Sequence, residues 1–203
     1  MTRLLLVAGS PRRASLNAGL LAELALRLQG RCEIDVLQPA EVRLPVFNQD
    51  LEQDAATMAE VVTLHRRFAA CDGLVIASPE YNGQLPPYLK NLIDWVSRLP
   101  HVDPRADNPF LQCPVLLCSA STGWSGGALA IPHARALFGY LGADVLGEPL
   151  CVPHADQAWD GQAFVFDPFF EDRIDGAAER ILRAAQQRRA ALPLPQESAC
   201  PTC

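Results

Sequence analysis

The feature that most constrains the fold is a regular alternation of short apolar runs with amphipathic helical segments. Residues 4–8 form a continuous apolar run, which is typical of a strand buried on both faces of a sheet. Residues 15–29 follow a polar turn and carry leucines four residues apart, so they predict a helix with one apolar face. Ser15 is suited to cap the start of this helix, and Gly30 is suited to end it.

The same alternation continues along the chain. We expect further strands at residues 33–37, 73–77, 114–119 and 144–146, and further helices at residues 52–70, 86–99, 126–141 and 171–189. Strict alternation of this kind favours an α/β fold, in which helices cover both faces of a parallel sheet. We expect one domain over residues 1–190 and a disordered, Pro-rich tail over residues 191–203.

Size and charge limit the function classes. The 203 residues carry a formal net charge of −6, and this acidity disfavours non-specific binding to nucleic acid, which needs clustered Lys and Arg. No apolar stretch approaches the roughly 20 residues of a membrane span. The apolar run near the N-terminus is shorter than the core of a signal peptide and ends in a polar turn. We therefore expect a cytoplasmic protein with neither a membrane nor a nucleic-acid partner.

The chain has seven cysteines. Five are scattered among apolar residues and are expected to be reduced and partly buried: Cys32, Cys71, Cys113, Cys118 and Cys151. Cys200 and Cys203 form a terminal CxxC motif, which fits a redox pair, half of a metal site or two exposed thiols in a mobile tail. No second Cys or His pair has the spacing to complete a zinc site, so we favour the exposed thiols and expect no bound metal.

Three loops follow predicted strands at the edge where open α/β sheets bind ligands. The first loop, residues 9–17, joins a buried strand to a helix N-terminus. It carries the hydroxyls of Ser10 and Ser15, the amide of Asn17 and the guanidinium of Arg12. Together with free backbone N–H groups, these side chains suit a single terminal phosphate. The alternative is that Ser15 only caps the helix and Arg12 is a solvated charge.

The second loop, residues 78–87, is long and rich in turn-forming residues. Its Asn82-Gly83 pair permits positive φ and turns backbone groups outward, which suits a flat heteroaromatic ring with alternating donors and acceptors. The alternative is a tight turn in which Tyr81 packs as a lid. We expect Glu80 to face solvent or to cap a helix rather than to move a proton.

The third loop, residues 119–127, consists mostly of small residues, among them Ser121, Gly123 and the Gly126-Gly127 pair. Small side chains let the backbone approach a ligand closely. A flexible linker is the alternative.

Taken together, the three loops resemble those of the NADPH-dependent FMN reductase family, the flavodoxin-fold group that includes quinone, chromate and azo-dye reductases. The family's opening G-S-x-R-x-x-S-x-N pattern is matched by Gly9, Ser10, Arg12, Ser15 and Asn17. Its P-E-Y-N-G and L-K-N-x-I-D-W patterns are matched by residues 79–83 and 89–95. The resemblance covers roughly residues 3–147 in the correct order, whereas residues 151–170 and the CxxC tail depart from it.

The resemblance implies a flavodoxin-like three-layer sandwich with a five-stranded parallel sheet in the order 2-1-3-4-5. It implies FMN as cofactor, NADPH or NADH as reductant, and a small acceptor such as a quinone, chromate or an azo compound. Hydride would pass through flavin N5, so no catalytic side chain is implied. A homodimer or homotetramer is implied in the same way.

Residue by residue, the resemblance also implies an FMN site. The phosphate would be held by Ser10, Arg12, Ser15 and Asn17. The isoalloxazine ring would be lined by Pro79, Glu80, Tyr81, Asn82 and Gly83, and closed on its other side by Ser121 and Gly123. In the L-K-N-x-I-D-W segment we expect Lys90 at the surface, and we expect Asn91 and Asp94 to brace the neighbouring flavin loop.

Two other functions stay open on the sequence alone. One is a flavodoxin-type electron carrier with no substrate of its own, and the other is a flavin-free binding or regulatory module on the same fold. The residues identify neither the physiological acceptor nor a preference between NADH and NADPH, because no ribose-reading Asp or Arg can be recognised.

Overall fold

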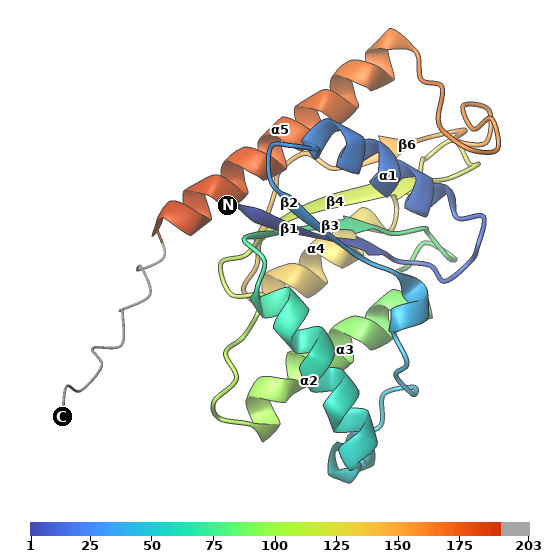
Figure 1. The fold of residues 1–203 in the computed structure, drawn as a ribbon. Helices are drawn as coiled ribbons and strands as arrows, with labels where there is room; N and C mark the ends of the chain where they lie inside the picture. Colours follow the sequence, from blue (N-terminus) through green and yellow to red (C-terminus); the bar gives the residue numbers. More distant parts are fainter. Residues whose placement is uncertain (192–203) are drawn as a thin grey trace.

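A parallel sheet forms the centre of the protein (Figure 1). The structure is a computed structural model that describes residues 1–191. The strands are β1 Arg3–Ala8, β2 Glu33–Leu37, β3 Gly73–Ala77, β4 Pro114–Ala120, β5 Asp144–Val145 and β6 Leu150–Val152. Their order is β2-β1-β3-β4-β5 with every neighbouring pair parallel, so the strand order implied by the resemblance is confirmed.

Two short strands share the fifth position of the sheet. β5 pairs with the start of β4, at Pro114 and Val115, and β6 pairs with the end of β4. The sequence predicted only the first of them, because Gly147 and Pro149 interrupt the apolar run that would otherwise indicate a strand. β6 therefore corrects the prediction, and it extends the sheet at the carboxyl end of β4.

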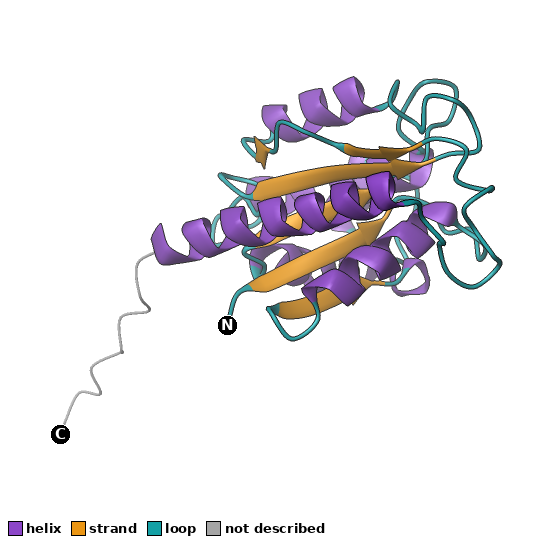
Figure 2. Cartoon of the chain, turned by 90° about the horizontal axis from the view of Figure 1, so that it is seen from above, coloured by secondary structure: helices purple, strands orange, loops and turns teal. Residues whose placement is uncertain are grey.

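Helices cover both faces of the sheet and complete three layers (Figures 1 and 2). They are α1 Leu16–Leu28, α2 Ala55–Ala69, α3 Pro87–Val102, α4 Ile131–Tyr140 and α5 Pro168–Ala191. α1 and α5 pack on one face around Leu24 and Ile181, whereas α2, α3 and α4 pack on the other around Phe68 and Phe138. All four side chains are fully buried, and Leu24 is one of the leucines whose four-residue spacing predicted the apolar face of α1.

The first two helices start at capping groups. The Ser15 side chain accepts a hydrogen bond from the Ala18 N–H at the start of α1, and Gly30 follows the helix at φ 74°, as predicted. The predicted start of the second helix at residue 52 is wrong. Residues 49–53 form a 3₁₀ turn, and the Asp54 side chain caps α2 after it.

Other boundaries also differ from the prediction. The fourth helix begins at Ile131 rather than at residue 126, because Gly126 and Gly127 have φ values of 61° and 81°, which a right-handed helix does not accept. α3 continues to Val102. Within residues 1–191, no helix combines the length and the apolar character needed to cross a bilayer. Ala191, the first residue of the predicted tail, belongs instead to the last helix, which spans Pro168–Ala191. The other residues of the predicted tail lie outside the described range.

The cysteines of the described chain are all free. Four of them are buried and Cys151 is half-buried, which confirms the prediction for these five. The prediction for Cys200 and Cys203 concerns residues outside the described range.

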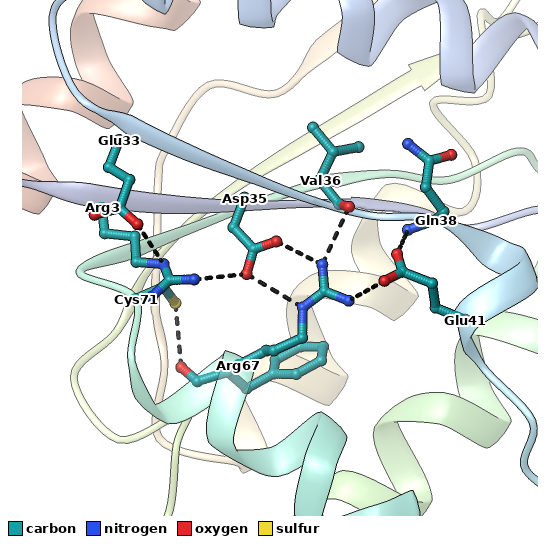
Figure 3. A network of polar contacts seen from close by, with 9 residues as sticks. Arg3, Glu33, Asp35, Val36, Gln38, Glu41, Arg67 and Cys71 are labelled. Carbon is teal, nitrogen blue, oxygen red and sulfur yellow. Dashed lines mark hydrogen bonds and ion pairs between the residues drawn. The ribbon is translucent and has the colours of Figure 1, made fainter.

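An ionic network ties α2 to the outer strand β2 (Figure 3). The Arg67 guanidinium donates to the Asp35 carboxylate and to the Val36 carbonyl, and Arg3 on β1 donates to the same carboxylate. Burial alone would raise the pKa of the Asp35 carboxyl. The hydrogen bonds and charges of Arg67 and then Arg3 outweigh burial and hold this pKa below its usual range.

The substitution Asp35→Asn tests this network. Because the folded-state pKa of Asp35 is lowered, the carboxylate stabilises the fold above its unfolded pKa of about 4, and that contribution is lost as pH falls through the folded-state value. We expect the variant to be about 1–2 kcal/mol less stable than the wild type at neutral pH, with the difference shrinking below about pH 4. Urea unfolding across this pH range measures both free energies.

The matched control is Asp156→Asn, which removes a carboxylate from an exposed position. Its effect should stay within about 0.5 kcal/mol at every pH. A loss for Asp35→Asn that does not change with pH would contradict the role given to the Asp35 charge.

Candidate cofactor site

The loops that follow β1, β3 and β4 meet at the carboxyl edge of the sheet and border one cavity of about 180 Å³. Its lining residues come from all three loops: Ser10, Arg12, Ser15, Leu16, Asn17, Pro79, Glu80, Tyr81, Ala120, Ser121 and Thr122. The structure therefore brings together eight of the eleven predicted site residues. Asn82, Gly83 and Gly123 belong to the same loops but do not line the cavity.

Hydrogen bonds between the strand ends hold the first two loops in place. The Gly9 N–H donates to the Ala77 carbonyl over 2.7 Å, and the Ser78 N–H donates to the Cys118 carbonyl over 2.9 Å. Pairing thus continues one residue beyond β1 and β3. A Cβ on Gly9 would lie 3.0 Å from the Ser78 Cα, which is why glycine stands where the first loop leaves the sheet.

Two nearly buried hydroxyls line the cavity beside the N-terminus of α1. Ser10 Oγ accepts a hydrogen bond from the Arg12 N–H at 3.3 Å and lies 3.4 Å from the Tyr81 hydroxyl. Ser15 Oγ caps α1, and the same side chain still borders the cavity. The N–H groups in the first turn of a helix have no intrahelical acceptor, so this end of α1 favours an anion.

The Arg12 side chain folds back on its own loop. Its Nε and Nη2 atoms both donate to the Ala14 carbonyl, at 3.1 and 2.6 Å, in a contact that is exposed to solvent. Both bonds go to a neutral oxygen, so within residues 1–191 no carboxylate neutralises this guanidinium. The guanidinium borders the cavity, and its hydrogen-bond partner is the neutral carbonyl of Ala14.

Asn17 has a different main role from the one the resemblance implies. Its Nδ2 donates to the Ala120 carbonyl over 2.9 Å, and its Oδ1 accepts from the Ala120 N–H over 3.0 Å. The amide is buried and fastens the first loop to the end of β4. One N–H of the amide is left for a ligand. The Asn17 side chain therefore acts mainly to hold the first loop against the end of β4.

The second loop contains a tight turn, and its Asn82-Gly83 pair takes the positive φ values that the sequence predicted. Tyr81 and Gln84 exchange backbone hydrogen bonds of 3.0 Å each. Between them, Asn82 and Gly83 have φ values of 54° and 73°, which Asn and Gly tolerate best. These two residues form the tip of the turn, while Tyr81 is 45% exposed and borders the cavity.

Glu80 caps a helix, as predicted. One of its carboxylate oxygens accepts hydrogen bonds from the N–H groups of Leu129 and Ala130, at 2.9 and 3.2 Å. Ala130 is the residue that precedes α4, so the negative charge stands at the positive end of that helix. The same contact links the second loop to the third.

The third loop is supported from β6. The Ser121 N–H donates to the Val152 carbonyl, and the Ala155 N–H donates to the Ser121 carbonyl. No sequence signal pointed to this support, because it comes from residues that depart from the recognised pattern. A Cβ on Gly127 would lie 1.9 Å from Ser119 Oγ, so this glycine is required by packing.

Asn91 braces a different loop from the predicted one. Its Oδ1 accepts from the Phe47 N–H at 2.7 Å and its Nδ2 donates to the Pro45 carbonyl at 2.9 Å. It therefore holds the segment between β2 and α2. Asp94 pairs with Lys90, which lies at the surface as predicted. Sequence spacing places polar residues on one side of a helix but does not say which loop passes that side.

Comparisons with known proteins agree with the geometry of the site. Residues 2–157 match the sequence profile of the family described as NADPH-dependent FMN reductase. A quinone reductase of Escherichia coli strain K12 is 36% identical over 141 residues, which are 70% of this chain and 71% of that protein. An NAD(P)H-dependent FMN reductase of Pseudomonas aeruginosa is 30% identical over 181 residues, which are 89% and 91% of the two chains.

A solved structure is similar over nearly its whole length. It is that of FerB, a flavoenzyme NAD(P)H:(acceptor) oxidoreductase from Paracoccus denitrificans. The TM-score is 0.78 at 25% sequence identity, and the match covers 93% of this chain and 99% of FerB.

The substitution Asn17→Ala tests the brace between the first loop and β4. It leaves the buried N–H and carbonyl of Ala120 without their partner, and we expect a loss of about 2–3 kcal/mol in the free energy of unfolding. Urea denaturation measures it. The control Gln187→Ala removes an exposed amide from α5 and should change stability by less than about 0.5 kcal/mol. Equal effects of the two substitutions would show that the brace contributes nothing.

Proposed function

Because the chain belongs to the NADPH-dependent FMN reductase family, we propose that it is an FMN-dependent NAD(P)H oxidoreductase that reduces quinones at the cavity between its three loops. FMN and a nicotinamide reductant are the cofactors of this family. One observation carries the proposed location. A single cavity gathers two hydroxyls, a helix N-terminus and a cation without a carboxylate partner at the ends of β1, β3 and β4.

The residues at one end of the cavity fit a phosphate. Ser10 and Ser15 offer hydroxyl hydrogens, and Asn17 retains one amide N–H. The first turn of α1 adds backbone N–H groups and the positive end of the helix dipole. Arg12 needs only to leave the Ala14 carbonyl to add a charge-assisted hydrogen bond. This donor set suits a terminal phosphate in a protein whose overall charge is negative.

The second and third loops fit a flat ring. We place Pro79, Glu80 and Tyr81 along one side of the isoalloxazine, with Asn82 and Gly83 at its outer end. On the opposite side we place Ser121 and Gly123. The support for this arrangement is that both loops border the same cavity and that Glu80 fixes one to the other through α4.

FMN held at this site would supply the redox chemistry, with hydride passing from NAD(P)H through N5 to a quinone, chromate or an azo compound. The chain supplies position: the turn at Tyr81 and the braces of Asn17 and Glu80 fix the loops before ligands arrive. Fixed backbone dipoles at this edge stabilise negative charge without reorganisation. No side chain of the site has to act as an acid or a base.

We also propose the setting in which this activity operates. Residues 1–190 act as one domain, and the protein works in the cytoplasm as a homodimer or homotetramer. Trp124 of the third loop and Leu129, two residues after it, are 77% and 55% exposed, and exposed large apolar side chains of this kind are common at contacts between subunits.

The first test is spectroscopic and kinetic. We expect the purified protein with added FMN to show the absorption band of bound flavin. This band should bleach with NADPH or NADH and return when a quinone is added. With both substrates present, the nicotinamide should be oxidised steadily. A flavin that shuttles single electrons without steady turnover would identify a flavodoxin-type carrier. Protein that takes up no FMN would identify a flavin-free module, and either result would contradict the proposal.

The substitution Arg12→Ala tests the phosphate end. Loss of one charge-assisted hydrogen bond should weaken FMN binding by about 1.5–3 kcal/mol, or roughly 10- to 150-fold in Kd. Titration of flavin fluorescence measures the Kd. The neighbouring Arg13 is exposed and does not line the cavity, so Arg13→Ala is the matched control and should leave the Kd within about twofold. Equal affinity of the Arg12 variant and the wild type would remove Arg12 from the site.

A further inference from the structure

Two buried thiols meet at the opposite edge of the sheet from the cavity. Cys71 stands two residues before β3 and Cys113 stands one residue before β4, so both lie at the amino ends of neighbouring parallel strands. They belong to the same apolar cluster, at 3% and 0% exposure. Each thiol has the largest influence on the pKa of the other, which places the two sulfurs close together. The Cys71 Sγ also donates to the Phe68 carbonyl at 3.1 Å, a contact drawn in Figure 3.

The C-terminal end of α5 contacts the segments that carry this pair. The Arg188 guanidinium donates through Nη1 to the carbonyl of Cys71 at 2.8 Å and through Nη2 to the carbonyl of Leu111 at 3.4 Å. The Arg188 side chain thus connects the two segments that carry the cysteines. Arg188 lies in the last turn of the helix, which ends at Ala191, and terminal turns open more readily than the rest of a fold.

We propose that Cys71 and Cys113 are the site of a reversible intramolecular disulfide, formed by hydroperoxides when the last turn of α5 opens. The register of β3 and β4, with Leu74 opposite Val115, sets Cys113 beside Asp72 and within one residue of Cys71. Neighbouring strands lie about 4.8 Å apart, which suits the Cα separation of about 4.4–6.8 Å in a disulfide. Burial ordinarily makes a thiol inert, and here it restricts the reaction to a small oxidant and to the opened helix end.

The electrons balance with one hydroperoxide per disulfide. The Cys113 thiolate attacks an oxygen of hydrogen peroxide, which breaks the O–O bond, gives a sulfenic acid and releases hydroxide that is protonated to water. The Cys71 sulfur then attacks the Cys113 sulfur, and the second oxygen leaves as water. Two thiols are oxidised and one peroxide is reduced to two waters. The neighbouring Cys71 side chain outweighs burial and holds the pKa of the Cys113 thiol below its ordinary value, so Cys113 reacts first.

The first experiment treats the full chain with hydrogen peroxide, blocks remaining thiols under denaturing conditions and maps the peptides by mass spectrometry. We expect one linked pair of peptides, carrying Cys71 and Cys113, that separates after dithiothreitol. An internal control is Cys118 and Cys151, which stand on paired strands but pack into different apolar clusters and should stay unlinked. Full alkylation of Cys71 and Cys113 after peroxide, irreversible oxidation of either, or a link to Cys200 or Cys203 instead would overturn the proposal.

The second experiment tests the role of Arg188. Arg188→Ala should form the same linked peptides several times faster than the wild type, because the segments before β3 and β4 lose their common donor. The control is Arg183→Ala, which removes an exposed arginine from α5 and should not change the rate. Circular dichroism at the temperature used confirms that each variant is folded. A rate for Arg188→Ala that equals the wild-type rate would overturn the role of the helix end.

Discussion

The site depends on the register of three parallel strands. In the ladder, Ala8 stands opposite Ala77, and Ala77 stands opposite Cys118, so β1 and β3 end at the same level and β4 continues two residues farther, to Ala120. The hydrogen bonds from Gly9 to Ala77 and from Ser78 to Cys118 carry this alignment one residue past the strands. The loops that follow must therefore leave the sheet side by side. A shift of any one strand would separate residues that lie about 70 and 110 positions apart in the chain.

Most polar side chains around the cavity serve the backbone before they serve a ligand. Asn17 saturates both backbone groups of Ala120, and Glu80 saturates two N–H groups that precede α4. The groups that keep donor capacity include two hydroxyls, one N–H of Asn17, the first turn of α1 and Arg12. This division explains how a chain of net charge −6 can offer an anion site. The favourable potential is local and is built mostly from oriented N–H dipoles.

The sequence predicted the sheet and most of the cavity because both rest on local signals. Buried strands read as apolar runs, and the three loops carry recognisable residues at fixed spacing. Errors occurred where a long-range contact decides the outcome. The start of α4 depends on the packing of Gly127 against Ser119, and the partner of Asn91 depends on the path of the segment after β2. The support that β6 gives to Ser121 was missed because a three-residue strand has no periodicity to detect.

The burial of the cysteines has a chemical consequence for an enzyme of this family. Quinones are electrophiles that add to accessible thiolates and alkylate them irreversibly. Burial raises the pKa of Cys32, Cys118 and Cys151, so these sulfurs are both shielded and protonated. Along residues 1–191 no cysteine is fully exposed. Alkylation of these three thiols by an electrophilic acceptor is therefore disfavoured.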